Sequence, residues 1–408
     1  RFAIHYPNEE RAAGRPLRTR PVYEMQKDMG AVFGLNYGWE HPQWFADAPG
    51  TEDTNGFTRQ NWWGPVGEEC KMLRERAGII DISNFAKYRV KGPGAEEWLN
   101  AVFANRMPKS VGRSCLTPLI SVRGGIAGDA TVTRVAEDEF WIVSSGMAER
   151  YHKRFFDMVP LPEGTTFESR TEAMCGFNVA GPKSREMLQR LTNASLATED
   201  FPFMRSQQIE LAGVKCLALR VSFTGDLGWE LHCATEDQAQ LYSALLEAGK
   251  DFGAGPVGAR ALMSMRVEKG YGSWSREYSP EYFPHEVGFA PLCKLDKDFL
   301  NKEAAEKAMA EPEREELVLI HIDEADVTAS NADATGGEPI RDVNGIPVGR
   351  VTSGTYGYTV GMSLALGYVK AGTVKAGDAV EVMVLGKPHA GRILHEPPFD
   401  PKGEKLRA

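Results

Sequence analysis

The sequence predicts an α+β protein with antiparallel sheets, followed by a separate all-β domain. Two observations support this prediction. Between residues 66 and 312, strand-like and helix-like segments are mixed without the regular β-α-β order that builds a parallel sheet. From Glu316 onward nearly every segment is a short strand bounded by Gly, Asn-Gly or Pro turns. We therefore place a boundary near residue 312 and expect residues 313–408 to form the β domain.

The composition is that of an ordinary globular protein, and a length of 408 residues suggests two or three domains. With 42% hydrophobic and 25% charged residues, a fibrous or disordered chain is excluded. The net charge is −9 and no long basic run occurs, which argues against a nucleic-acid partner. No apolar stretch approaches the roughly 18 residues of a membrane span, so we expect no membrane partner.

Six cysteines are scattered singly, without the spacing of a disulfide framework, and we expect reduced thiols. Residues 1–20 lack the apolar core of a signal peptide, and the chain begins with Arg1. These features favour a cytoplasmic setting, or the mitochondrial matrix if the chain is eukaryotic. The eight histidines never show the i, i+4 spacing of a helical metal site, so no metal is expected.

Residues 1–65 form a predicted N-terminal arm rich in Arg, Pro, Gly and aromatic residues. Its one helix-like patch lies near Tyr23–Met29. Such a segment cannot build a core of its own, so we expect its aromatic residues, among them Trp44 and the pair Trp62-Trp63, to be buried against another surface.

The region 66–312 carries the mixed pattern. Helical periodicity covers Cys70–Arg76, Ala95–Ala104, 147–157, Ser184–Leu191, Glu236–Phe252 and 302–310. Strand patterns cover Gly78–Ser83, Lys87–Val90, Leu116–Ser144, Phe177–Pro182 and Ala218–Cys233, with hairpins joining Val132–Val135 to Phe140–Val143 and turning at Thr224–Gly228. Ser184 is a candidate helix N-cap.

The usual catalytic signatures are absent. There is no G-x-S-x-G elbow and no P-loop. One G-x-G-x-x-G match, Gly253–Gly258, follows a predicted helix, whereas a dinucleotide site needs a preceding strand. We therefore expect no FAD or NAD site within this chain.

Three segments carry charged residues that a purely structural interpretation explains less well. Asp129 ends the Gly-rich segment Gly124–Asp129 and could simply cap that turn. Glu230 lies on an apolar strand, where a carboxylate is costly to bury, although strand alternation could point it to solvent. Arg266 lies in an apolar stretch and, taken alone, fits a core ion pair.

A series of segments resembles, in order, the glycine-cleavage T-proteins, which are aminomethyltransferases. The segments are Gly78–Ser83, Gly92–Gly94, Gly124–Asp129, Asn178–Arg185, Phe223–Glu230, Arg266–Glu268, Gly349–Gly354 and Ala365–Tyr368. The arm, with His5–Glu10, Gly14–Arg18, Gly30–Gly34 and Gly38–Glu40, and the segment 268–274 are more similar to the tetrahydrofolate half of dimethylglycine and sarcosine dehydrogenases. The resemblance covers about residues 66–400, and the arm extends it.

The resemblance implies a three-domain cloverleaf around a central folate channel. Residues 66–312 would form the folate-binding region as two intertwined subdomains, and residues 313–408 a barrel or jelly-roll-like domain. Tetrahydrofolate would be the cofactor. A methylated small molecule would be the substrate, and a flavoprotein dehydrogenase subunit, or an upstream FAD domain absent from this chain, would be the partner.

The resemblance also implies site residues. Glu230 would accept two parallel hydrogen bonds from the pterin, and Asp129 would lie near N5 and N10 of tetrahydrofolate. Arg266 would belong to the pterin pocket. Phe223 stands where the family has Tyr, so a hydroxyl contact is lost. Trp274 could stack on the pterin or aminobenzoyl ring.

These implications predict one-carbon transfer to N5 of tetrahydrofolate, from a methylated amine or from the iminium or formaldehyde derived from it. Asp129 would be the catalytic residue. An intact onium methyl donor would instead favour an aromatic cage, for which Tyr271, Trp274 and Tyr278 are candidates. Two rivals stay open: a non-catalytic folate-fold protein, against which the retained Asp129 and Glu230 argue, and a lipoyl-protein aminomethyltransferase.

Overall fold

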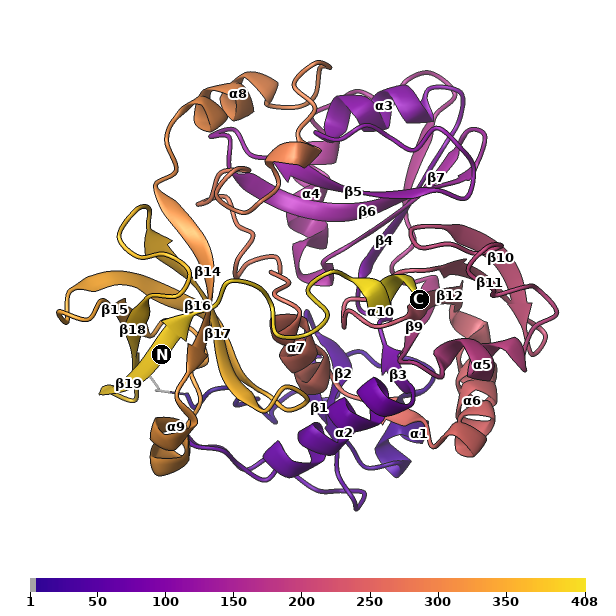
Figure 1. Cartoon of the computed structure of the whole chain (residues 1–408). Helices are drawn as coiled ribbons and strands as arrows, with labels where there is room; N and C mark the ends of the chain where they lie inside the picture. The colour runs from indigo at the N-terminus through magenta and orange to yellow at the C-terminus, as the bar shows by residue number, and fades with distance from the viewer. Residues whose placement is uncertain (1–4) are drawn as a thin grey trace.

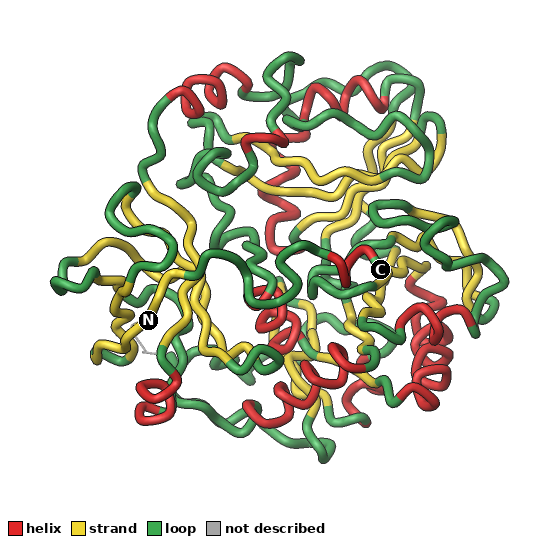
Figure 2. The backbone as a smooth tube through the Cα atoms, viewed as in Figure 1, coloured by secondary structure: helices red, strands yellow, loops and turns green. Residues whose placement is uncertain are grey.

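The computed structural model describes residues 5–408, and two sheets and a barrel form three lobes in it (Figure 1). The lobes surround helix α7 (Ala259–Glu268), while the N-terminal arm runs along the lower edge of the view. In Figure 2 the strands form the inner part of each lobe and most helices lie outside them. The α+β class expected from the sequence is confirmed.

The first lobe is a six-stranded sheet. Its strands lie in the order β10 (Ser206–Leu211), β11 (Val214–Leu219), β12 (Gly228–Ala234), β9 (Met174–Ala180), β3 (Gly78–Asp81) and β13 (Gly255–Val257). All pairs are antiparallel except β13 with β3. Helices α5 (Ser184–Gln189) and α6 (Gln238–Gly249) contribute to its core, which contains Phe177, Leu231 and Leu241.

The second lobe is a five-stranded antiparallel sheet. Its order is β5 (Ser114–Ile120), β6 (Ile126–Ala136), β7 (Glu139–Ser144), β4 (Ala86–Lys91) and β8 (Thr166–Ser169). Helices α3 (Ala95–Val102) and α4 (Glu149–Phe156) cover one face, where Tyr88, Val132 and Phe156 belong to one core. Since β3 and β4 are consecutive along the chain but lie in different sheets, the chain crosses between the lobes.

The third lobe is a closed six-stranded barrel. Its order is β14 (Glu315–Ile322), β17 (Met362–Lys370), β16 (Pro347–Gly357), β15 (Pro339–Arg341), β18 (Ala379–Val384) and β19 (Lys387–Ile393). Helix α8 (Lys302–Ala310) precedes it, α9 (Glu324–Ser330) follows β14, and α10 (Glu404–Arg407) ends the chain. Inward-facing Ile320, Ile340 and Val382 fill the barrel, as strand alternation requires.

The arm contains more structure than the sequence predicted. Helix α1 (Tyr23–Asp28) is followed by the hairpin β1 (Ala31–Asn36) and β2 (Trp39–Phe45), and α2 (Trp63–Glu75) begins at its end. Trp44 is 1% exposed and packs in one cluster with Val66 and Cys70 of α2. The surface that buries this tryptophan therefore belongs to this chain, so its burial gives no reason to expect an external partner.

Other differences from the sequence predictions are local. The strands β8 and β10, like β1 and β2, were not predicted because they are short or lack clear alternation. Ser184 does not cap α5: Lys183 occupies the N-cap, and the Ser184 hydroxyl donates to the Gly181 carbonyl at 2.6 Å. The hydroxyl is thus used to close the preceding turn.

Candidate functional site

The two sheets meet through a layer of apolar side chains. Trp141 and Val143 of β7 pack against Leu217 and Leu219 of β11 in one buried cluster. We call this the inter-sheet layer. Because side chains directly opposite each other on paired strands share a face, the cross-strand partners of these residues also face the layer.

Glu230 reaches the layer in this way. It lies opposite Leu219 on β12, and its side chain is only 13% exposed. His232, two residues further along the strand, is fully buried, and its Nε2 lies 3.4 Å from a carboxylate oxygen of Glu230. Burial lowers the pKa of His232. Strand alternation therefore directs Glu230 into the protein, and the alternative that it faces solvent is wrong.

Asp129 reaches the same layer from the other sheet. It lies inside β6, opposite Pro118, so it does not cap the Gly turn before the strand. Thr131 is opposite Val143, and Asp129, two residues away, shares its face of the sheet. The side chain is half-buried, and burial raises the pKa of Asp129 to about 6. Asp129 and Glu230 thus project from facing sheets.

Asn178 is a polar neighbour of Glu230 that the sequence analysis did not single out. It lies opposite Glu230 on β9 and is 3% exposed. Its Nδ2 donates to the carbonyl oxygens of Trp229 at 3.2 Å and Val221 at 3.4 Å, which fixes the orientation of the amide. Within residues 5–408 its buried Oδ1 has no partner. A polar residue between Phe177 and Val179 was the signal available in the sequence.

The aromatic residues predicted for the site do not all pack against the same side chains. Phe223 and Tyr271 stack with ring centroids 6.0 Å apart. Trp274 donates from Nε1 to the Ala127 carbonyl at 2.9 Å, which ties it to the strand that carries Asp129. Burial raises the pKa of Tyr278, and the charge of Asp129 adds to this effect, so this tyrosine is also close to Asp129.

Arg266 is bound within the chain. It is 1% exposed, and its guanidinium donates to Glu277 and to the Tyr271 carbonyl at 2.8 Å each and to the Ser353 hydroxyl at 2.5 Å. The core ion pair that fits this residue taken alone is therefore present. It connects the segment 271–277 to the barrel, and any part it has in a pterin pocket stays a prediction.

Comparison with protein families identifies the chain over most of its length. Residues 22–297 match the GCVT N-terminal domain, and residues 316–400 match the glycine cleavage T-protein C-terminal barrel domain. The chain belongs to the glycine-cleavage T-protein family. The resemblance seen in the sequence is thereby confirmed.

Individual proteins similar to this T-protein family member support the family assignment. Dimethylglycine dehydrogenase, mitochondrial, from Mus musculus is 35% identical over 97% of this chain and 45% of its own length. 4-Methylaminobutanoate oxidase (formaldehyde-forming) from Paenarthrobacter nicotinovorans is 31% identical over 100% of this chain and 49% of its own. The chain spans about half the length of these curated relatives.

A solved structure has the same fold. The glycine cleavage system aminomethyltransferase T from Bartonella henselae has a TM-score of 0.80 and 22% identity, over 94% of this chain and 99% of that one. At this identity the likeness concerns the fold alone.

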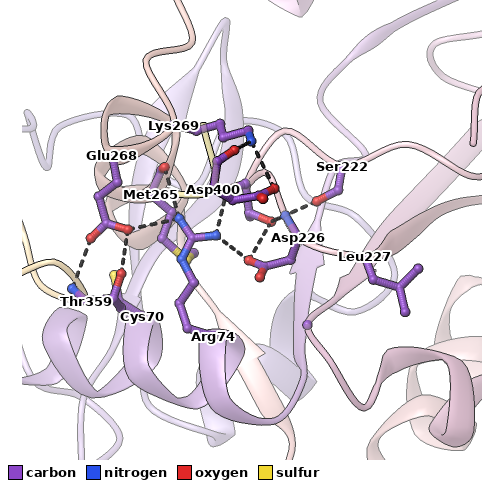
Figure 3. Close-up of polar contacts among 12 residues, drawn as sticks. Cys70, Arg74, Ser222, Asp226, Leu227, Met265, Glu268, Lys269, Thr359 and Asp400 are labelled. Carbon is purple, nitrogen blue, oxygen red and sulfur yellow. Dashed lines mark hydrogen bonds and ion pairs between the residues drawn. The ribbon is translucent and has the colours of Figure 1, made fainter. Parts of the chain in front are cut away.

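In this T-protein fold, a buried charge network joins α2 to Asp226, within the segment Phe223–Glu230, and to Glu268 at the end of α7 (Figure 3). Arg74 of α2 contacts Asp226, and its Nη2 donates to Glu268 at 2.9 Å. Lys269 contacts Asp400 at 3.1 Å. These partners lie up to 194 residues apart, so no local sequence pattern indicates that they pair. The network fixes the two segments that carry Phe223, Glu230 and Tyr271.

A separate cavity of about 250 Å³ lies between the arm, α7 and the barrel. Arg266 lines it, whereas the other predicted site residues do not. In the described part of the chain there is no helix long and apolar enough to span a membrane. Nor do residues 5–408 hold three or more His, Cys, Asp or Glu side chains grouped as a metal site would require.

Proposed function

We propose that this chain binds tetrahydrofolate between its two sheets and transfers a one-carbon unit to N5. The unit comes from a methylated amine, or from the iminium or formaldehyde derived from it. The observation that carries the proposal is the pair of carboxylates, Asp129 and Glu230, which face one layer from opposite sheets. Family membership supports it, as do relatives named for N-methyl amines and formaldehyde.

The side chains around Glu230 fit a pterin. The 2-amino group and N3–H of a pterin are adjacent donors, and a carboxylate accepts such a pair with two parallel hydrogen bonds. The unpaired Oδ1 of Asn178 is a further acceptor beside Glu230. Because a buried acceptor without a partner is costly, a ligand that supplies donors here removes that cost.

Asp129 is suited to the reacting end of the ligand. The folate nitrogen supplies the nucleophile, so the protein has to orient the reactants and exclude water. A carboxyl group whose pKa is about 6 can take up the proton released at nitrogen near neutral pH. Its negative charge also stabilises a cationic one-carbon centre. Trp274 is bonded to the Ala127 carbonyl of the same strand, and its ring lies against Tyr151 and His152 of α4.

We propose an amine-oxidising flavoprotein as the source of the one-carbon unit, on a partner subunit or on the same polypeptide. The relatives named as dehydrogenases and oxidases support this, because their matched region is only about half of each protein. Several are named mitochondrial, which fits the matrix as one of the two expected compartments.

The proposal is tested by anaerobic calorimetric titration of tetrahydrofolate into the wild-type chain and the variants Glu230→Ala and Asp129→Asn. We expect binding to be lost in Glu230→Ala and kept in Asp129→Asn. Mass spectrometry of the folate after incubation with a methylated amine or with formaldehyde then separates methyl from methylene transfer. Absence of binding to the wild-type chain would overturn the proposal.

A further inference from the structure

His232 is a buried histidine whose two ring nitrogens have no hydrogen-bond partner within the described residues 5–408. It lies on β12 with 0% exposure, two residues after Glu230 and on the same face of the strand. Its Nε2 lies 3.4 Å from a carboxylate oxygen of Glu230, which is within reach of a hydrogen bond but not aligned as one. Because a buried polar group without a partner lowers stability, the presence of this histidine calls for an explanation.

The neighbours of His232 hold its ring in place. Leu217 of β11 and Gly176 of β9 lie opposite it on the two adjacent strands. Trp141 of the facing sheet has its ring centroid 6.2 Å from that of the imidazole. A Cβ added to Gly176 would lie 3.0 Å from Nδ1, so glycine at this position leaves room for the ring. These contacts keep the imidazole beside Glu230.

Two further polar side chains face the inter-sheet layer, but backbone carbonyls engage both of them. Lys87 lies opposite Val143 on the paired strands β4 and β7, and its ammonium donates to two carbonyls at 3.0 and 2.9 Å. The amide of Asn178 donates to two carbonyls as well. In the described part of the chain no group donates a hydrogen bond to Glu230, so nothing yet fixes the orientation of its carboxylate.

The chemistry of the imidazole suits it to this task. Burial lowers the pKa of His232, so the ring is neutral near pH 7 and carries one N–H. With the proton on Nδ1, the lone pair of Nε2 would face a carboxylate oxygen at 3.4 Å, and the two would repel each other. With the proton on Nε2, the same contact joins a donor to an acceptor.

We propose that His232 is a positioning residue whose Nε2–H donates to Glu230 when the ligand is bound and so orients the carboxylate toward the two donors of a pterin. This inference rests on the proposed function. Each carboxylate oxygen has two lone pairs, so one oxygen can accept from the imidazole and from the pterin together. The contact is not aligned in the free protein, and hydrogen bonds at such sites commonly align only in the complex.

The test compares two replacements of equal length, His232→Gln and His232→Met. The amide nitrogen of glutamine can take the place of Nε2 and donate, whereas methionine has no donor. In anaerobic calorimetric titration, His232→Met should bind tetrahydrofolate about tenfold more weakly than the wild type, and His232→Gln within about threefold of it. Equal affinities of the two variants would overturn the inference.

A second readout separates positioning from a loss of packing. A tetrahydrofolate analogue with a methyl group in place of the 2-amino group lacks one of the two pterin donors, and the wild type should bind it about tenfold more weakly than tetrahydrofolate. A carboxylate that is not oriented gains less from the second donor, so in His232→Met this ratio should fall to about threefold. A loss of packing alone would lower both affinities and leave the ratio unchanged, against the inference.

His389 provides a matched control in the barrel. It is 2% exposed, and its ring nitrogens lie 3.0 Å from the Ser330 hydroxyl and 3.1 Å from the Lys387 carbonyl. His389→Met removes a buried imidazole from a region for which no ligand is proposed. Thermal unfolding should show a loss of stability, whereas the affinity and the ratio should equal those of the wild type. A ratio that fell in this variant too would show that it follows stability, which contradicts the inference.

The failure of the inference can be distinguished from the failure of the proposed function. If the wild-type chain binds no tetrahydrofolate, the proposed function fails first. If it binds tetrahydrofolate and prefers it to the analogue, but His232→Met keeps that preference, only the role of His232 is overturned.

Should His232→Met not fold, the wild-type protein is studied by NMR with 15N-labelled histidine. The signals of His232 are identified by their absence in His232→Gln. We expect the Nε2–H tautomer in the complex with tetrahydrofolate. The Nδ1–H tautomer would overturn the inference, because it leaves no donor facing Glu230.

Discussion

The closed barrel and the inter-sheet layer are both built from antiparallel strands, but they bury different side chains. The barrel core is aliphatic, with Ile320, Ile340 and Val382 among its members, and the polar side chains of Ser363 and His389 that its strands bury are hydrogen-bonded. The layer between the sheets adds Lys87 and His232 to its apolar residues. Since buried polar groups lower stability unless they are satisfied, the difference separates a region that maintains the fold from the region in which we propose that a ligand binds.

The largest expected effect concerns the network that supports the site. Arg74→Met leaves Asp226 and Glu268 buried without their cation, so we expect a loss of about 3–5 kcal/mol in the free energy of unfolding. Urea denaturation measures it. The control is Arg89→Met, which removes a partly exposed pair with Glu139 and should cost about 1 kcal/mol or less. Equal losses in the two variants would contradict the expectation that the buried network contributes more to stability than the partly exposed pair.

The next effect is on turnover. Asp129→Asn should reduce one-carbon transfer by about 10² or more while leaving tetrahydrofolate affinity nearly unchanged, since it removes one acid–base or electrostatic group. Asp138→Asn, an exposed acid beyond the end of the same strand, is the control and should behave as the wild type. Normal turnover in Asp129→Asn would remove this residue from the reaction.

A smaller effect is expected with pH. Because burial raises the pKa of Asp129 to about 6, the carboxylate form is about one tenth of the total at pH 5 and about nine tenths at pH 7. Turnover at saturating folate should therefore rise through pH 6 and level off above pH 7. The residual turnover of Asp129→Asn should not rise through pH 6. A rise with the same midpoint in that variant would mean that another group causes the pH dependence.

The smallest effects are expected from the same substitution made in the barrel and in the inter-sheet layer. Val382→Ala in the barrel and Val143→Ala in the layer each remove two methyl groups from a buried side chain, at about 1–3 kcal/mol of stability. Thermal unfolding should show similar losses. Only Val143→Ala should also weaken tetrahydrofolate binding, by several-fold, because Val143 packs in one cluster with Leu219, the cross-strand partner of Glu230. Equal affinities would place the ligand elsewhere.

Much of the local structure could be predicted from the sequence. Period-two alternation and Gly-rich turns predicted the hairpin β6–β7 and the β-rich C-terminal domain, which the structure confirms as a barrel. The order of motifs predicted the family and drew attention to Asp129 and Glu230. These signals are local because they depend on neighbours within a few residues along the chain.

Tertiary structure alone decided which side chains meet. The register of two sheets brings Asp129, Glu230 and Lys87 to one layer, although they are separated by up to 143 residues in the numbering, and it gives Glu230 the neighbour Asn178. It also gave Arg266 its partner Glu277 and buried Trp44 within the chain. Alternation fixes which residues share a face of a strand, but the surface which that face meets depends on how whole sheets pack, and sequence spacing does not contain that information.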